Sequence, residues 1–159
     1  MNRLLLFTDG SVNVQQKIGC GACLCIDENE LDKLELKMLV KTKMFENTSS
    51  TKLELQTLLW AFSTLESSSR KVMVYTDSQN ITGLPERRVR LERNNYKSGK
   101  GLALKNEKLY REFFTYLDEF DIQVIKVKGH KPGREKSNIE KVFSIVDKAA
   151  RRGLRNSKR

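Results

Sequence analysis

The sequence predicts an α/β protein built around a mixed five-stranded sheet flanked by helices. Five short apolar runs have the length and composition of strands, and polar turns join the first three of them. Amphipathic helical segments separate the later runs. Because short turns make neighbouring strands antiparallel and helical crossovers make them parallel, the expected strand order is three-two-one-four-five.

The first three strands are predicted in the N-terminal third of the chain. Residues 4–7 form a continuous apolar run that ends in a Thr-Asp-Gly-Ser turn, which is typical of a strand buried on both faces. A second apolar run covers residues 19–26. Apolar and charged side chains alternate over residues 34–44, which indicates a half-buried third strand after the polar turn at 27–32.

The apolar spacing then changes from a period of two to a period of about 3.6, which indicates a helix. Its apolar stripe, which follows the cap-rich residues 47–51, consists of Leu55, Leu58, Leu59, Phe62 and Leu65. Residues 72–75 form the fourth predicted strand, and a Thr-Asp-Ser turn ends it. Two of the predicted strands therefore end in Thr-Asp.

The second half of the chain adds a basic segment, a helix, a strand and a final helix. Within residues 83–105, Lys and Arg replace the apolar pattern in a predicted helix that starts near Pro85 and in the loop that follows. Residues 122–128 form the fifth strand. The two remaining helices are marked by apolar stripes at Leu109, Phe113, Leu117 and Phe120, and at Ile139, Val142, Phe143, Val146, Ala150 and Leu154.

Length and composition fit one domain, residues 1–159, with a packed core. The chain of 159 residues carries a formal net charge of +10, with 38% hydrophobic and 31% charged residues. No apolar run is long enough for a leader or a membrane span. Three closely spaced cysteines, Cys20, Cys23 and Cys25, favour a reducing compartment, so we expect a cytoplasmic protein that binds no membrane. The net charge favours a polyanionic partner.

The positive charge is concentrated in two segments. Residues 87–105 hold seven basic residues and one acidic residue. Residues 148–159 hold six basic residues and no acidic one, and they end in a basic tail at about 155–159. The first segment contains the predicted basic helix and loop, and the second begins within the final predicted helix.

Two aspartates are expected side by side at one edge of the sheet. Asp9 and Asp77 each follow a strand, and these two strands are parallel, so both end at the edge where open α/β sheets place their functional sites. Asp27 also follows a strand, but that strand runs in the opposite direction. We therefore interpret Asp27 as a solvated turn residue.

Two further carboxylates border buried helix faces. Glu54 lies four residues before Leu58 in the first turn of its helix, and Asp147 lies four residues after Phe143. Any one of these four acids alone is explained by a helix-terminal charge or a cap. Four together repel one another and need cations, and Mg²⁺ prefers oxygen ligands. Two such ions would hold the attacking and leaving oxygens of a phosphodiester displacement.

Five segments of the chain together resemble ribonuclease H of type 1, which cleaves the RNA strand of RNA/DNA hybrids. In the family's order they are residues 7–11, 48–55, 75–79, 127–130 and 147–151. A single Thr-Asp-Gly-Ser would be a weak signal, but the set in its strand and helix contexts is specific. The resemblance spans essentially the whole chain and implies the ribonuclease H-like fold.

The resemblance also implies which residues bind metal. Asp9 would bridge two Mg²⁺ ions, Glu54 and Asp77 would hold one of them, and Asp147 would help to hold the other. Mn²⁺ is expected to substitute for Mg²⁺.

His130 would be the family's mobile-loop histidine, which assists proton transfer or product release. The stretch from His130 to Asp147 is longer than in the commonest bacterial members, so Glu140 and Glu135 remain alternative fourth ligands. The Ala-Ala-Arg sequence at residues 149–151, shortly after Asp147, favours Asp147 as the fourth ligand.

Further positions are expected to contact the nucleic acid. They are Ser49, Ser50, Thr51, Arg87, Arg88, Arg90 and Asn106. The three hydroxyl residues match positions that read 2′-hydroxyls and phosphates, although they also suit helix capping. The arginines lie in the place of a basic protrusion that grips the DNA strand in some members, and the asparagine resembles one that contacts the backbone. Residues 12–17 replace a glycine-rich loop of many members, so the approach of this backbone to the hybrid is expected to differ.

The implied function is endonucleolytic cleavage of the RNA strand of an RNA/DNA hybrid, which leaves 5′-phosphate and 3′-hydroxyl ends. The expected oligomeric state is a monomer. Two alternatives stay open at this point: a non-catalytic hybrid-binding module, and a DNA nuclease or resolvase on the same fold.

Overall fold

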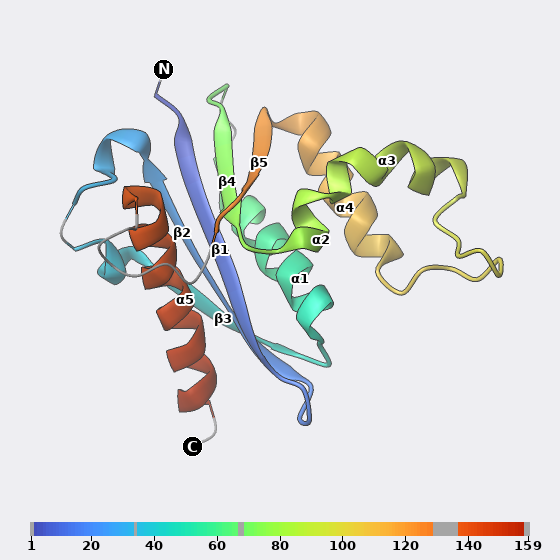
Figure 1. The fold of residues 1–159 in the computed structure, drawn as a ribbon, viewed down its shortest axis with the longest axis horizontal. Coiled ribbons are helices and arrows are strands. Elements are labelled where there is room, and N and C mark those ends of the chain that lie inside the picture. The colour runs from blue at the N-terminus through green and yellow to red at the C-terminus, as the bar shows by residue number, and fades with distance from the viewer. Residues whose placement is uncertain (1, 34, 67–68, 129–136, 158–159) are drawn as a thin grey trace.

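The computed structural model describes residues 2–33, 35–66, 69–128 and 137–157. The described residues form a five-stranded sheet, and Figure 1 shows helices on both of its faces. In chain order the elements are β1 (Leu4–Asn13), β2 (Ile18–Asp27), the 3₁₀ helices η1 (Glu28–Glu30) and η2 (Leu36–Leu39), β3 (Lys41–Glu46), α1 (Ser50–Ser63), β4 (Val72–Thr76), α2 (Gln79–Thr82), α3 (Leu84–Arg93), α4 (Glu107–Glu119), β5 (Ile122–Lys126) and α5 (Asn138–Asn156).

The five strands form one mixed sheet in the order β3-β2-β1-β4-β5, which confirms the predicted order. β2 pairs antiparallel with both β1 and β3. β4 pairs in parallel with both β1 and β5. Because parallel neighbours need a crossover, the helices between these strands leave the plane of the sheet and cover it.

The core consists of two apolar clusters, one on each face of the sheet. Helix α5 covers one face, and α1 and α4 cover the other (Figure 1). In β1, Leu6 joins the cluster of α1 and α4, whereas Leu5 and Phe7 join the cluster of α5. β1 is therefore buried on both faces, as predicted. Since side chains alternate along a strand, Asp9 points to the same side as Leu5 and Phe7.

Leu53 of helix α1 lies close to two glycines of the β1–β2 hairpin. A Cβ atom added at Gly10 would lie 2.9 Å from Cδ2 of Leu53, and one added at Gly19 would lie 2.6 Å from the same atom. Both distances are shorter than the separation that carbon atoms of packed side chains keep. The missing side chains make room for Leu53, which directly precedes Glu54.

The prediction of a single strand over residues 34–44 was wrong. Residues Leu36–Leu39 form η2, and the third strand is Lys41–Glu46. Leu36 is buried in the cluster of α5, whereas Met38, on the same predicted face, is 74% exposed. The alternating pattern thus does not reflect a continuous buried strand face.

The predicted turn after residue 7 was also wrong. β1 continues to Asn13 because β2 pairs with it along its whole length, out to Ile18. Only the pairing of β1 with β4 ends early, at Phe7 and Tyr75. Asp9 therefore lies inside a strand, just beyond the last pair of the parallel ladder.

The basic segment forms a helix and a loop, as predicted. α3 has Pro85 in its first turn, and the chain after α3 is held by an isolated bridge between Lys97 and Ala103. Figure 1 shows this loop extending away from the sheet. None of the helices in the described part of the chain is long and apolar enough to cross a membrane.

Candidate active site

Asp9 and Asp77 are placed together by the register of the two central strands. Phe7 of β1 is the partner of Tyr75 in β4, and their rings stack with centroids 5.0 Å apart. Asp9 and Asp77 each follow two residues later. Asp27 pairs with Leu4, so it lies at the other end of β1, where Arg70 binds it at 2.6 Å. The prediction that Asp27 lies apart from the other carboxylates is confirmed.

Glu54 reaches the same edge of the sheet from α1. Its Oε2 atom accepts a hydrogen bond of 2.5 Å from the hydroxyl of Ser78, the residue that follows Asp77. The Ser78 Oγ atom also accepts a bond from the backbone N–H of Ile81 and so caps α2. The sequence analysis assigned no role to Ser78. Its position directly after Asp77 and before a helix could have indicated a capping residue close to the site.

Asp147 approaches from α5 on the other side. Its carboxyl group lies within hydrogen-bonding range of Asp9. One oxygen also pairs with the guanidinium of Arg151, one turn further along the helix, at 3.2 Å. Glu140 instead closes a capping box with Ser137 at the start of α5, and Glu135 lies outside the described residues. The contacts of Asp147 therefore favour it over Glu140.

The electrostatics of this edge reflect the crowding of acids. Burial, the hydrogen bond with Asp147 and repulsion by Asp77 raise the pKa of Asp9 to about 8. Burial also raises the pKa of Glu54; repulsion by Asp77 adds to this, and the hydrogen bond from Ser78 opposes it. The two shifts link all four carboxylates electrostatically.

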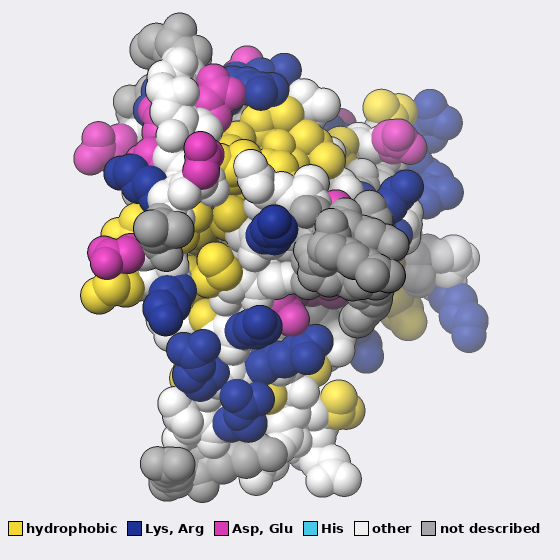
Figure 2. Space-filling view, turned by 60° about the vertical axis from the view of Figure 1, so that its left-hand side comes forward, with side chains coloured by type: hydrophobic (Ala, Val, Ile, Leu, Met, Phe, Trp, Pro, Cys, Tyr) yellow, Lys and Arg dark blue, Asp and Glu magenta, His cyan; other side chains and the backbone are white. Residues whose placement is uncertain are grey.

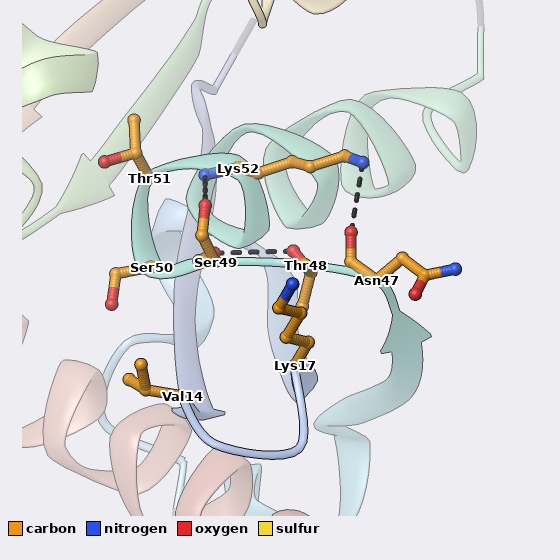
Figure 3. A pocket seen from close by; sticks show the side chains of 8 residues that line it. All are labelled: Val14, Lys17, Asn47, Thr48, Ser49, Ser50, Thr51 and Lys52. Carbon is orange, nitrogen blue, oxygen red and sulfur yellow. Dashed lines mark hydrogen bonds between the residues drawn. The ribbon is translucent and has the colours of Figure 1, made fainter.

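A polar pocket lies beside the start of α1 (Figure 3). It is lined by Val14, Lys17, Asn47, Thr48, Ser49, Ser50, Thr51 and Lys52. The hydroxyl of Ser49 accepts a hydrogen bond of 3.3 Å from the backbone N–H of Lys52, so it caps α1. Ser50 and Thr51 are exposed. All three predicted hydroxyl residues thus lie on one surface, with a lysine from the β1–β2 connection and another from α1.

The predicted arginines of α3 differ in their surroundings. Arg88 binds both carboxylate oxygens of Asp118 in α4, at 2.6 and 2.8 Å. It also binds Glu92 and lies over the ring of Phe114. The Arg88 guanidinium therefore joins α3 to α4.

Arg87 is likewise held within the protein. It donates to the backbone and side-chain oxygens of Asn80 and lies over the Tyr110 ring. Arg90 is exposed. Asn106 is the N-cap residue of α4 but makes no capping hydrogen bond with its side chain. The prediction for His130 falls outside the described residues.

A sequence model of the RNase H family matches residues 1–155. The chain belongs to this family. It is therefore a hydrolase of the ribonuclease H type. Two proteins of Haemophilus influenzae, named Ribonuclease H and Ribonuclease HI, are 29% and 28% identical to it over 153 residues. Each alignment covers 95% of this chain and 89% of the relative.

Solved structures support the RNase H fold. The solution structure of the PFV RNase H domain matches with a TM-score of 0.71 and 18% identity, over 96% of this chain and 94% of that domain. A foamy viral protease-reverse transcriptase in complex with RNA/DNA hybrid also matches with a TM-score of 0.71, at 15% identity. That match covers 96% of this chain and 20% of the viral chain.

Membership of the RNase H family implies use of a divalent metal ion, and the donors at the sheet edge fit one. The four carboxylates supply only oxygen atoms, the ligands that Mg²⁺ and Mn²⁺ prefer. A buried acid such as Asp9, with two acidic neighbours, needs a cation in order to ionise at neutral pH. Among the described residues, no three acidic, histidine or cysteine side chains are arranged closely enough to coordinate one metal ion together.

Proposed function

We propose that this RNase H family member hydrolyses the RNA strand of RNA/DNA hybrids with the help of two Mg²⁺ ions, leaving 5′-phosphate and 3′-hydroxyl ends. The observation that carries the proposal is the approach of Asp9, Glu54, Asp77 and Asp147 to one another at the edge of β1 and β4. The viral enzyme with the same fold, in complex with RNA/DNA hybrid, supports the choice of substrate.

In this proposal the carboxylates bind the ions and the neighbouring groups orient the carboxylates. When bound, the ions supply an activated water and stabilise charge on the leaving oxygen. Asp9 would help to hold both ions, Glu54 and Asp77 would hold one of them, and Asp147 would help to hold the other. Ser78 fixes the rotamer of Glu54 through the 2.5 Å hydrogen bond.

The polar pocket at the start of α1 would receive the sugar-phosphate backbone. Ser49, Ser50 and Thr51 offer hydroxyl groups, which suit 2′-hydroxyls and phosphates. Lys17 and Lys52 add positive charge at the same place. Arg90 and Asn106 would contact the strand beyond this pocket, with Arg87 and Arg88 holding the basic segment in position.

The decisive experiment is cleavage of a labelled RNA/DNA hybrid in Mg²⁺, with Asp9→Asn and Asp77→Asn as test variants. Asp27→Asn is the matched control, because Asp27 also adjoins a strand end but at the opposite edge of the sheet. We expect cleavage by the wild type and the control only. Equal cleavage by all four proteins would overturn the metal-site assignment, and hybrid binding without cleavage in either Mg²⁺ or Mn²⁺ would indicate a binding module.

Two measurements refine the same proposal. Extension of the cleaved RNA by a polymerase tests the 3′-hydroxyl end, and digestion by a 5′-phosphate-dependent exonuclease tests the other end. A duplex DNA substrate tests the alternative of a DNA nuclease. Cleavage of DNA in preference to hybrid would replace the proposed activity.

The fourth ligand is tested by comparing Asp147→Asn with Glu140→Gln. Loss of cleavage is expected for the first variant, because Asp147 contacts Asp9, and near-normal cleavage for the second, because Glu140 caps α5. The reverse result would move the ligand to Glu140.

His130 is proposed to move a proton or to assist product release, so His130→Ala should lower kcat more than it weakens hybrid binding. Weaker binding with unchanged turnover would contradict this role. The monomeric state and the cytoplasmic location remain predictions, which sedimentation and cell fractionation would check.

A further inference from the structure

Helix α5 carries a row of basic side chains along its solvent-facing side. The row consists of Lys141, Lys148, Arg151, Arg152 and Arg155, all of them exposed. At about 100° per residue these positions lie opposite the buried side chains of Val142, Val146, Ala150 and Leu154. Figure 2 shows Lys and Arg side chains gathered on the lower half of this face of the molecule. We call this row the α5 basic surface.

Most of these cations are not balanced by acids of the protein. Within the described residues, Arg151 of this surface forms an ion pair with Asp147, at 3.2 Å. Lys148, Arg152 and Arg155 have no recorded ion pair in that part of the chain. This contrasts with Arg88 of α3, which is bound by two carboxylates.

Stabilisation of the helix itself accounts for only part of the surface. Cations in the last turn of a helix interact favourably with its dipole, which explains Arg155. That effect falls off within one turn, whereas Lys148 lies two turns before the end of α5 and Lys141 lies near its start. The positions of Lys141 and Lys148 therefore call for another explanation.

The length of the surface suits a polymer of negative charges. From Lys141 to Arg155 the helix rises by about 21 Å at 1.5 Å per residue. A single phosphate or small anion would contact only neighbouring side chains of this row. Each strand of a duplex carries one phosphate about every 3.4 Å, so a nucleic acid would contact the row along its whole length. The row also begins and ends on either side of Asp147, which belongs to the proposed cleavage site.

We propose that the α5 basic surface binds the phosphate backbone of the substrate duplex outside the cleavage site. It lies on the face of the sheet opposite to α4, whereas the basic segment of α3 extends away on the other side (Figure 1). The duplex is thus held from both sides of the carboxylates. This inference rests on the proposed function for the identity of the duplex.

The test compares two triple variants that remove the same charge. The first is Lys148→Gln, Arg152→Gln and Arg155→Gln on α5. The control is Lys37→Gln, Lys71→Gln and Lys108→Gln, three exposed lysines on other elements. Glutamine favours helices, so α5 should fold in the variant, and thermal unfolding of both proteins checks this.

Binding of hybrid is measured in EDTA over a series of salt concentrations. For a hybrid of about 30 base pairs, we expect the α5 variant to bind roughly five- to ten-fold more weakly and its log-log salt slope to be flatter by about two. The control should resemble the wild type.

Several outcomes would overturn the proposal. They are wild-type binding by the α5 variant and an equal loss in the control. An acidic protein that binds the wild type but not the α5 variant, with hybrid binding unchanged, would assign the surface to another partner. A wild type that binds hybrid but does not cleave it would contradict the proposed activity alone, so the two proposals fail separately.

Discussion

On the α1 side of the active site, the carboxylate of Glu54 accepts a hydrogen bond from the neutral hydroxyl of Ser78. On the α5 side, the carboxylate of Asp147 pairs with the charged guanidinium of Arg151. Each side also carries a basic segment. In α3 the guanidinium of Arg88 is engaged by Asp118 and Glu92, whereas the basic surface of α5 faces solvent.

This comparison of α3 with α5 shows that the net charge counted along a segment of sequence differs from the charge that the folded segment presents to a ligand. A guanidinium that already binds two carboxylates contributes little attraction to a phosphate, because its field is largely compensated. The α3 segment therefore combines two arginines that are held within the protein, Arg87 and Arg88, with exposed cations such as Arg90. On the α5 basic surface all the cations are exposed, and the ion pair of Arg151 with Asp147 involves a single carboxylate.

The largest effect is expected from Asp9→Asn. Asp9 lies between the two sides, and in the proposed mechanism it would help to hold both metal ions, so its loss should remove several kcal/mol of transition-state stabilisation. Cleavage should fall by at least about a hundred-fold, whereas hybrid binding, which depends on both basic segments, should change by less than about three-fold. Rate and affinity measurements on one preparation check this, and a parallel loss of affinity would contradict it.

The same variant should change stability in the absence of metal. Because the pKa of Asp9 is raised from 3.8 to about 8, folding disfavours its ionised form, and stability contributed by the neutral form is lost as the pH rises between these values. Asp9→Asn should therefore melt at a higher temperature than the wild type at pH 8 in EDTA. The difference should shrink toward pH 4, and a constant difference would contradict the assigned pKa shift.

Ser78→Ala tests the neutral support on the α1 side. Without the hydroxyl donor, the pKa of Glu54 rises and its carboxylate loses its fixed orientation, so protons compete more strongly with metal. Half-maximal activity should need about ten-fold more Mg²⁺, and the increase should be larger at lower pH.

Ser78→Thr is the matched control, because it keeps both the hydroxyl and the cap of α2. If the alanine and threonine variants need equal concentrations of Mg²⁺, the hydroxyl does not support the metal site. Thermal unfolding separates this effect from a loss of the cap.

A smaller effect is expected from Arg90→Gln in α3. Arg90 is the exposed arginine of the three that were predicted to bind, so its removal should weaken hybrid binding about two- to three-fold and flatten the salt slope by about one. Lys71→Gln removes an exposed charge elsewhere. If both variants lose affinity equally, the α3 helix has no specific part in binding.

The smallest effect, on stability alone, is expected from Arg88→Gln. This change breaks a two-bond contact with Asp118 and removes the guanidinium from the ring of Phe114. The melting temperature should fall by about 2–4 °C, whereas Arg90→Gln should leave it unchanged. Equal melting temperatures for the two variants would mean that the α3–α4 contact does not stabilise the fold.

Much of this architecture follows from the sequence because it depends on local periodicity. The apolar runs, the short turns and the helical stripes are enough to order the five strands, and the strand order places Asp9 beside Asp77. The prediction failed at residues 34–44, where part of the run forms a 3₁₀ helix with Leu36 buried under α5 and Met38 exposed. Period two is a weak signal when the alternate side chains of a run are not all buried.

The contacts that finish the site depend on pairs far apart in the chain. Ser78 binds Glu54 across 24 residues, and Arg88 binds Asp118 across 30 residues. No periodicity links such partners, so the sequence identified Glu54 without the group that orients it. The same limit applies to Arg87 and Arg88, because the sequence does not reveal that they contact Asn80 and Asp118 within the protein.

The two glycines that lie against Leu53 limit which substitutions the β1–β2 hairpin tolerates. Leu53 sits directly before Glu54, and a methyl group added at Gly10 or Gly19 would press on the buried Leu53 side chain. We therefore expect alanine at these two positions to disturb the start of α1, and they should tolerate it less well than many exposed residues near the site. The placement of one carboxylate is thus governed by empty space in the neighbouring hairpin.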